Sequence, residues 1–202
     1  RKKKSSGSYP RRTDRCDVTG IDLHRESFAE VIADALPVLR AHWAEVVTFP
    51  RFPFDLDVAG YERLDAAGML RIFTGRIDGR LIAYASFVVC RHAHYAGSGD
   101  QARLDAIYVL PEYRGRYVGM HLIRYCDGML AAEGVSAVFH GAPVAEPTFA
   151  NLLMRCGYRP VETIWCKQFK ETRDAGSGIE AISANNLNPE PTPADREELY
   201  VT

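Results

Sequence analysis

The stretch Leu104–Leu122, LDAIYVLPEYRGRYVGMHL, decides which fold the rest of the chain is expected to adopt. An apolar strand runs into a turn rich in Arg and Gly, and the turn leads directly into a helix. Such a turn directs backbone N–H groups at one spot before a helix N-terminus, where the helix dipole also favours negative charge. Gly115 and Gly119 would let the backbone approach a ligand closely. Arg114 and Arg116 would add positive charge, so the stretch predicts a phosphate-binding turn, although such turns are more often ordinary chain reversals.

This stretch resembles motif A of the GNAT family of N-acetyltransferases, whose signature is Arg or Gln, two residues, Gly, one residue, and then Gly or Ala. Arg114 and Gly119 match the signature, whereas Tyr117 occupies its middle Gly position. The likeness covers roughly Ser27–Phe169 in element order. Within the family, the chain looks most like acetyltransferase-like proteins encoded by bacteriophages, through LDAIYVLPEYRG, HLIRYCDGML and RCGYRPVETIWCKQF.

The resemblance implies the GNAT fold, an α/β (α+β) architecture with a mixed, largely antiparallel, twisted sheet that splays at its central strands and is flanked by helices. Hydrophobic periodicity and turn residues predict a matching order of elements, βααβββαβαβ. Asp78-Gly79 is typical of a type I′ hairpin. Pro37 lies inside the first helical pattern and predicts a kink there or two helices, with Ser27 as a possible N-cap. The expected helices are Glu26–Val47, Asp55–Ala67, Tyr117–Glu133 and Thr148–Cys156; the expected strands are Cys16–Leu23, Met69–Ile77, Leu81–Arg91, the strand before the turn, Val135–His140 and Arg159–Phe169.

Composition predicts one folded domain between two arms. Residues 1–20 form a basic arm, residues 21–169 the GNAT-like domain, and residues 170–202 an extended or disordered tail rich in Gly, Ser, Asn and Pro. The basic arm either contacts phosphate or an acidic protein surface or is a solvated tail. A net charge of −1 gives no reason to expect nucleic acid or an anionic membrane as partner. No apolar run approaches the roughly 18 residues of a membrane span, so a cytoplasmic location is expected. If the protein is phage-encoded, the expected location is the cytoplasm of the bacterial host or the virion.

The resemblance also implies acetyl-CoA (coenzyme A) as co-substrate, without a metal. The five cysteines are scattered, with no C-x-x-C spacing, which fits reduced core residues. Backbone amides of Gly115–Gly119 would hold the pyrophosphate, and backbone groups of Ile107–Leu110 would bind the thioester carbonyl. The expected cofactor-binding residues are Ile107, Val109, Arg114, Gly115, Arg116, Tyr117, Val118 and Gly119. Tyr117 is expected in the first helical turn, where negative φ is allowed and its N–H still donates.

Asp105, His140 and His94, the last in the loop before the strand, are candidates for the catalytic base. Asp105 is the carboxylate nearest the reacting centre, and strict alternation places it on the opposite face of the strand from Leu104, Ala106 and Tyr108. A structural role fits Asp105 equally well, in which its carboxylate pairs with Arg103 or caps a neighbouring loop. His140, at the end of the next strand, is the second candidate.

The acceptor site is predicted less directly. Phe52 and Phe54 lie in the aromatic loop TFPRFPFD, which in the resembling family covers the acceptor, and His94 lies in a polar loop. Loop aromatics also commonly attach a loop to the core.

The family's usual tyrosine acid for the leaving thiolate corresponds to Leu153, and its usual Asn corresponds to Glu146, so the site is non-standard. Two hypotheses remain open. The chain is an acyl-CoA-dependent N-acyltransferase for a small-molecule or protein amine, or a catalytically weak or inactive module whose arms hold it in a larger assembly such as a phage virion.

Overall fold

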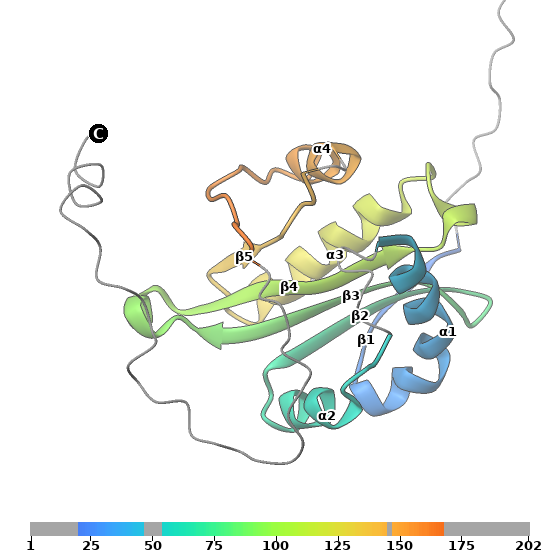
Figure 1. Cartoon of the computed structure of the whole chain (residues 1–202), viewed down its shortest axis with the longest axis horizontal. Coiled ribbons are helices and arrows are strands. Elements are labelled where there is room, and N and C mark those ends of the chain that lie inside the picture. Colours follow the sequence, from blue (N-terminus) through green and yellow to red (C-terminus); the bar gives the residue numbers. More distant parts are fainter. Residues whose placement is uncertain (1–19, 47–53, 145–146, 168–202) are drawn as a thin grey trace, which may run out of the picture. The chain divides into compact units, whose positions relative to one another are not determined.

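The computed structural model of this chain describes residues 20–46, 54–144 and 147–167 (Figure 1). The chain divides into two units, Arg1–Glu162 and Thr163–Thr202. Both predicted arms, Phe52 and Glu146 lie outside the described residues, apart from Gly20 at the end of the basic arm. The assembly hypothesis, the domain boundaries and the cytoplasmic location therefore stay predictions.

A five-stranded sheet with the order β1-β2-β3-β4-β5 forms the centre of the fold. The pairs β1–β2, β2–β3 and β3–β4 are antiparallel, and β4–β5 is parallel. The predicted hairpin between β2 and β3 is confirmed, because Asp78 and Gly79 both have positive φ, 49° and 78°. The strands are β1 Asp22–Glu26, β2 Leu70–Ile77, β3 Arg80–Arg91, β4 Asp100–Val109 and β5 Ala137–Phe139.

Helices cover both faces of this sheet (Figure 1). On one face, α1 and α2 enclose a core that includes Phe28, Ile72 and Tyr108. On the other face, α3 packs on a core that includes Phe87 and Leu122. The helices are α1 Phe28–Val46, α2 Val58–Ala66, α3 Val118–Ala132 and α4 Pro147–Arg155, with short 3₁₀ turns η1 Ala93–Ser98 and η2 Pro111–Tyr113. The predicted mixed α/β, largely antiparallel fold is confirmed.

Helix α1 is one helix, although Pro37 lies inside it. At its start, the Ser27 amide donates to Glu30 Oε2 at 2.8 Å, and the Glu30 amide donates to Ser27 Oγ at 3.4 Å. These reciprocal bonds form a capping box. The buried face with Val31 and Val38 continues on both sides of Pro37, so packing maintains the helix despite the missing proline N–H.

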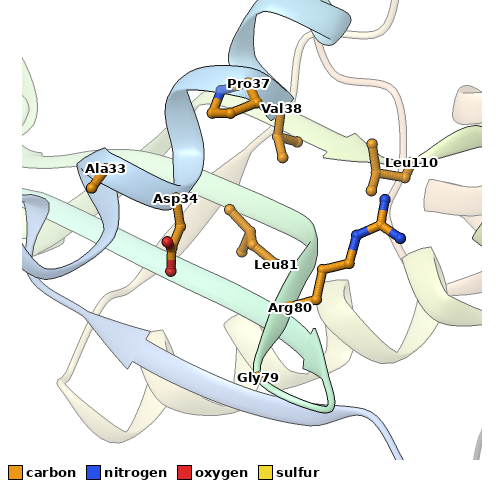
Figure 2. A pocket seen from close by; sticks show the side chains of 8 residues that line it. All are labelled: Ala33, Asp34, Pro37, Val38, Gly79, Arg80, Leu81 and Leu110. Carbon is orange, nitrogen blue, oxygen red and sulfur yellow. The ribbon is translucent and has the colours of Figure 1, made fainter.

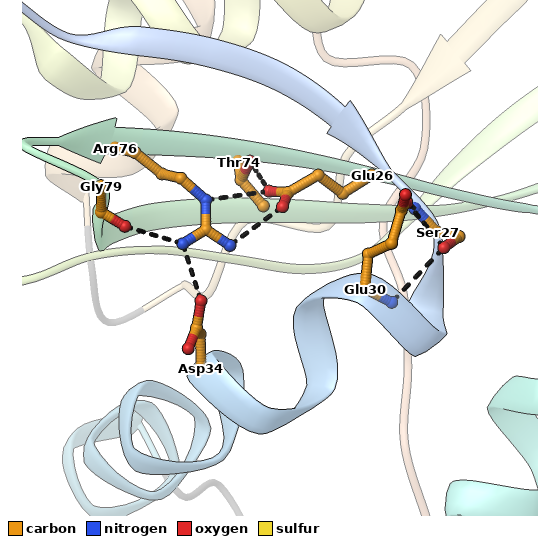
Figure 3. A network of polar contacts seen from close by, with 7 residues as sticks. All are labelled: Glu26, Ser27, Glu30, Asp34, Thr74, Arg76 and Gly79. Carbon is orange, nitrogen blue, oxygen red and sulfur yellow. Dashed lines mark hydrogen bonds and ion pairs between the residues drawn. The ribbon is translucent and has the colours of Figure 1, made fainter.

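A polar network joins β1, β2 and α1 (Figure 3). The Arg76 guanidinium donates to Glu26 Oε1 at 2.9 Å, to Asp34 Oδ2 at 2.8 Å and to the Gly79 carbonyl at 2.9 Å. Glu26 also accepts a hydrogen bond from the Thr74 hydroxyl. The Arg76 side chain is only 12% exposed and that of Glu26 18%, so the network satisfies charges that the fold has largely removed from water.

Two predicted strands differ from the structure. The first strand is Asp22–Glu26, whereas the prediction was Cys16–Leu23, of which residues 16–19 lie outside the described residues. No strand forms over residues 159–167, the described part of the predicted Arg159–Phe169 strand. The edge strand β5 is only three residues long, Pro160 has no N–H to donate, and Val161 is 73% exposed. Strand propensity depends on packing against a neighbouring strand, and this segment has too little partner to realise it.

Candidate active site

A bulge in β4 determines where Asp105 lies. Phe87 pairs with Leu104 and the preceding Ser86 pairs with Ala106, so Asp105 is the extra residue. Leu104 packs against the α3-side core, whereas Ala106 packs against the core under α1 and α2. The predicted placement of Asp105 opposite Ala106 and Tyr108 is wrong: because the bulge interrupts the alternation, its carboxylate lies on their face.

Two hydroxyl groups hold one oxygen of this carboxylate. Tyr61, from α2, donates to Asp105 Oδ2 at 2.6 Å, and Ser86 donates to the same oxygen at 2.8 Å. Burial and the adjacent carboxylate raise the pKa of Tyr61, so it remains a donor. Within the described ranges, no donor hydrogen-bonds to Oδ1, and Asp105 is exposed. Arg103 is not its partner, since it pairs with Glu162 at 3.5 Å. Asp105 therefore presents one orientationally fixed, open carboxylate oxygen.

An aromatic network lies beside Asp105 on the same face. His42 Nδ1 is hydrogen-bonded to Tyr84 Oη at 2.6 Å, and the His42 ring stacks on Tyr108 with centroids 4.7 Å apart. The Tyr108 hydroxyl donates to Glu45 Oε2 at 2.8 Å. Burial lowers the pKa of His42, which favours the neutral ring. Sequence reasoning missed these residues. Their signal was the presence of His42 and Glu45 four and seven residues after Val38, on the stripe of α1 that is otherwise apolar.

The turn after β4 has one open glycine. Gly115 has a φ of 74°, and an added Cβ would meet nothing within 4 Å. Gly119 differs, because a Cβ there would lie 3.2 Å from Leu152 Cδ2 of α4. The absence of a side chain at Gly119 therefore lets α4 pack closely against α3, in addition to any role in ligand binding. Helix α3 begins at Val118, and its first hydrogen bond joins the His121 amide to the Tyr117 carbonyl at 2.9 Å. The amides before His121 are those that an α-helix leaves unpaired, and these amides and the open glycine suit a phosphate.

Tyr117 does not have the predicted backbone conformation. It lies before the first helical turn as the N-cap residue, with φ 63° and ψ 4°, in the left-handed region. The expectation of negative φ is wrong because the chain enters α3 through this conformation, which costs a residue with a Cβ about 1–2 kcal/mol. Tyr117 is 57% exposed, and the Arg155 guanidinium lies 5.9 Å from its ring centre.

Arg114 is directed towards α1. Its Nε donates to the Val109 carbonyl at 2.8 Å, and its guanidinium binds Glu45 through both terminal nitrogens. The guanidinium also lies 5.0 Å from the centre of the Tyr108 ring. The positive charge of Arg114 is therefore already paired, whereas Arg116 makes no hydrogen bond or ion pair with another described residue.

The sheet separates on the β5 side of β4. Parallel pairing covers only Gln101–Arg103 with Ala137–Phe139, and β4 continues for six residues beyond it. The side chains of Ile107 and Val109 pack into the α3-side core. Their backbone thus borders a stretch where β4 has no strand partner on its β5 side in residues 20–46, 54–144 and 147–167. This is the splay that the resemblance to the GNAT family implied.

His140 lies on the opposite face from Asp105. Its ring contacts Phe87 of the α3-side core, with centroids 5.6 Å apart, and its Nε2 lies 3.1 Å from the Tyr158 hydroxyl oxygen. Burial lowers its pKa to about 4, so it is neutral at pH 7. The two predicted catalytic residues are thus separated by the sheet.

The remaining predicted residues are placed as follows. His94 is exposed in η1, which precedes β4, at the end of that strand away from the turn. Phe54 contacts Trp43, with ring centroids 6.2 Å apart, and lies 5.1 Å from the Arg40 guanidinium, so it attaches its loop to α1. Leu153 is buried in the core.

A hollow of about 380 Å³ lies between α1 and the β2–β3 turn (Figure 2). Its charged side chains are already paired, Asp34 with Arg76 and Arg80 with Glu112. Pro37, Val38 and Leu81 supply much of the remaining lining. This hollow thus lacks the open reactive group that Asp105 presents.

The described residues contain neither a metal-ligand cluster nor a membrane-spanning helix. No three His, Cys, Asp or Glu side chains among them are grouped as a metal site would require. None of the helices seen in the structure is both long and apolar enough to cross a membrane.

A largely antiparallel sheet that splays beside a bulged strand, followed by a glycine turn and a helix, defines the acetyltransferase class of α/β proteins. Residues 36–158 match the model of the Acetyltransferase (GNAT) family, and the chain belongs to this family. Comparison with curated proteins finds no significant match.

Solved structures share the fold. An aminoglycoside acetyltransferase from an uncultured soil metagenomic sample, in complex with sisomicin, has a TM-score of 0.61 and 11% identity over 75% of this chain and 96% of its own. Aminoglycoside N-acetyltransferase AAC(6')-Iy in complex with CoA has a TM-score of 0.59 and 21% identity, over 74% and 95%. Glucosamine-6-phosphate N-acetyltransferase from Arabidopsis thaliana has a TM-score of 0.56 and 13% identity, over 74% and 99%. The narrower likeness to phage-encoded proteins stays a prediction.

Proposed function

We propose that the protein is an N-acetyltransferase that transfers the acetyl group of acetyl-CoA to an amine. The observation that carries this proposal is the Asp105 carboxylate, which Tyr61 and Ser86 hold by one oxygen while the other stays open. It lies at the bulge of β4, four residues before the end of the strand that leads into the glycine turn.

The turn and the start of α3 would hold the cofactor. The open position at Gly115 and the unpaired amides of Val118 and Gly119 suit its pyrophosphate, since helix N-termini attract anions. Acetyl-CoA supplies the activated acyl group as a thioester. Ile107 and Val109 belong to the part of β4 next to the splay, where backbone groups are available to bind the thioester carbonyl.

Asp105 would receive the proton of the amine. The amine nitrogen bonds to the thioester carbonyl carbon, the carbon–sulfur bond breaks, and the sulfur leaves with its electron pair. The nitrogen loses one proton to Asp105, directly or through water. Leu153 has no hydroxyl group, so water protonates the thiolate, whose conjugate acid has a pKa of about 8.5.

The acceptor would be a cationic small-molecule amine. Asp105 has no cationic partner in the described part of the chain, so an ammonium group would supply one. The aminoglycoside acetyltransferases with a similar fold include one in complex with sisomicin, an amine-rich ligand. The face carrying Asp105 is also the face covered by α1 and α2.

The test measures thiol release from acetyl-CoA by the full chain, with sisomicin and a simple primary alkylamine as acceptors. Binding of CoA is measured in parallel by calorimetry. Turnover with either amine supports the proposal. Wild-type protein that binds no CoA and releases no thiol would overturn it, whereas CoA binding without turnover would leave a cofactor-binding protein that is not an acetyltransferase for these amines.

A further inference from the structure

A buried polar chain on the α3 face has no part in the reaction proposed above. The Tyr158 hydroxyl donates to Asp127 Oδ1 of α3, and His140 Nε2 lies 3.1 Å from the same hydroxyl oxygen. Phe87 and Phe149 contact the His140 ring, with centroids 5.6 and 6.1 Å away. Three polar side chains thus run in series from a helix to the residue that follows β5.

The series determines which nitrogen of His140 carries the proton. The single Tyr158 hydroxyl proton is directed at Asp127, so the oxygen can only accept from His140. The His140 Nε2 must therefore be protonated, and in the neutral ring the Nδ1 is then a bare acceptor. Burial lowers the pKa of His140 to about 4, consistent with a neutral ring. The bare Nδ1 has no proton to give to a thiolate, and the Nε2 proton is directed at the Tyr158 hydroxyl, so His140 does not replace the missing tyrosine acid.

That Nδ1 atom is buried and has no hydrogen-bond partner among the residues placed by the structure. Buried polar atoms in folded proteins are nearly always hydrogen-bonded, so an unpaired acceptor held this firmly needs a donor from elsewhere. Its position limits the source. Pairing between β4 and β5 stops at Arg103 and Phe139, so His140 is the first residue of its segment beyond the paired region, level with Leu104 and next to the β4 bulge.

We propose that His140 is a cofactor-binding residue whose Nδ1 accepts a hydrogen bond from an amide N–H of the coenzyme A arm, with Tyr158 and Asp127 as positioning residues. The inference rests on the proposed use of acetyl-CoA. It moves His140 from the role of base to that of an acceptor that orients the cofactor on the side of the sheet away from Asp105. Coenzyme A suits the site because its thiol-bearing arm carries amide donors.

The first measurement is the affinity of full-length protein for CoA by calorimetry, in wild type, His140→Phe and Tyr158→Phe. His92→Phe is the matched control, because His92 also has a buried, unpartnered Nδ1 but lies before η1, at the far end of β4. We expect His140→Phe to weaken CoA binding about 5- to 10-fold, as loss of one net hydrogen bond would, and His92→Phe to have no effect. Tyr158→Phe, which frees the ring to change tautomer, should weaken binding less.

The second measurement is the ¹⁵N spectrum of the wild-type imidazoles, which does not depend on a variant folding. We expect His140 to be protonated at Nε2 without ligand, and its Nδ1 resonance to move on addition of CoA. A proton on Nδ1, or wild-type CoA affinity in folded His140→Phe, would overturn the inference and leave the proposed function intact. Wild-type protein that binds no CoA would overturn both.

Discussion

Arg114 and Glu45 form a bidentate ion pair, with Nη1 2.5 Å from Oε1 and Nη2 2.8 Å from Oε2. Glu45 belongs to the last turn of α1, and Arg114 lies in the turn that leads to α3. Tyr108 of β4 donates to the same carboxylate. The pair therefore connects the helix that covers the Asp105 face with the turn proposed to hold the cofactor.

This pair predicts a pH dependence of stability. The Arg114 hydrogen bonds lower the pKa of Glu45 from 4.5 to about 2. Because the folded-state pKa is the lower one, the stabilisation is fully present above pH 4.5 and is lost as pH falls through about 2. We expect Glu45→Gln to reduce the free energy of unfolding at pH 7 by about 1 kcal/mol or less, since both side chains are about 40% exposed.

Denaturant unfolding of wild type and Glu45→Gln across pH 2–7 checks this. The difference between the free energies of unfolding of the two proteins should become smaller below pH 4.5. Glu112→Gln is the control, because its pair with Arg80 is longer, 3.3 Å, and more exposed. A wild-type advantage that stays constant down to pH 2 would contradict the assigned pairing.

Asp105→Asn should lower kcat/KM for acetyl transfer about 100-fold or more, because the amide cannot take the amine proton. The Asn oxygen can still accept from Tyr61 and Ser86, so stability and CoA affinity should be unchanged. Steady-state thiol release and calorimetry give the two values. Asp22→Asn, the same change at an exposed position of β1, should be neutral. Near wild-type turnover by Asp105→Asn would exclude Asp105 as the proton acceptor.

Tyr117→Gly should stabilise the protein by about 1 kcal/mol, because Gly adopts positive φ without the cost that a Cβ imposes. Removing the mostly exposed ring should cost the protein little stability. Tyr117→Ala is the matched control, since it removes the ring and its contact with Arg155 but retains the Cβ. In urea unfolding, the free energy of unfolding of Tyr117→Gly should be higher than that of Tyr117→Ala. Equal stability of the two variants would mean that the left-handed conformation at this position is not strained.

Arg76→Met should reduce the free energy of unfolding by about 3–5 kcal/mol, because it leaves the Glu26 carboxylate largely buried without its cation (Figure 3). Arg80→Met removes an exposed pair and should cost less than about 1 kcal/mol. Guanidinium unfolding at pH 7 compares them. Similar losses in the two variants would show that the network around Arg76 contributes no more than a surface pair.

Local sequence signals predicted much of the fold. Asp78-Gly79 specifies the β2–β3 hairpin because both residues tolerate positive φ. Ser27, predicted as a possible N-cap, lies at the start of α1, where the structure adds its partner Glu30. The glycine turn before α3 was also readable from residues adjacent in sequence. These features depend on interactions within a few residues, so the sequence by itself determined them.

Tertiary structure decided the site. A bulge defined by pairing with β3 places Asp105 on the face of Tyr61, which is 44 residues away in sequence. Arg114 pairs with Glu45 across 69 residues, and the predicted last strand does not form in its described part because β5 offers three residues to pair with. No local pattern encodes these contacts. A side chain's face, partner and charge state depend on register and on which distant segment packs beside it, and both arise only when the whole sheet has formed.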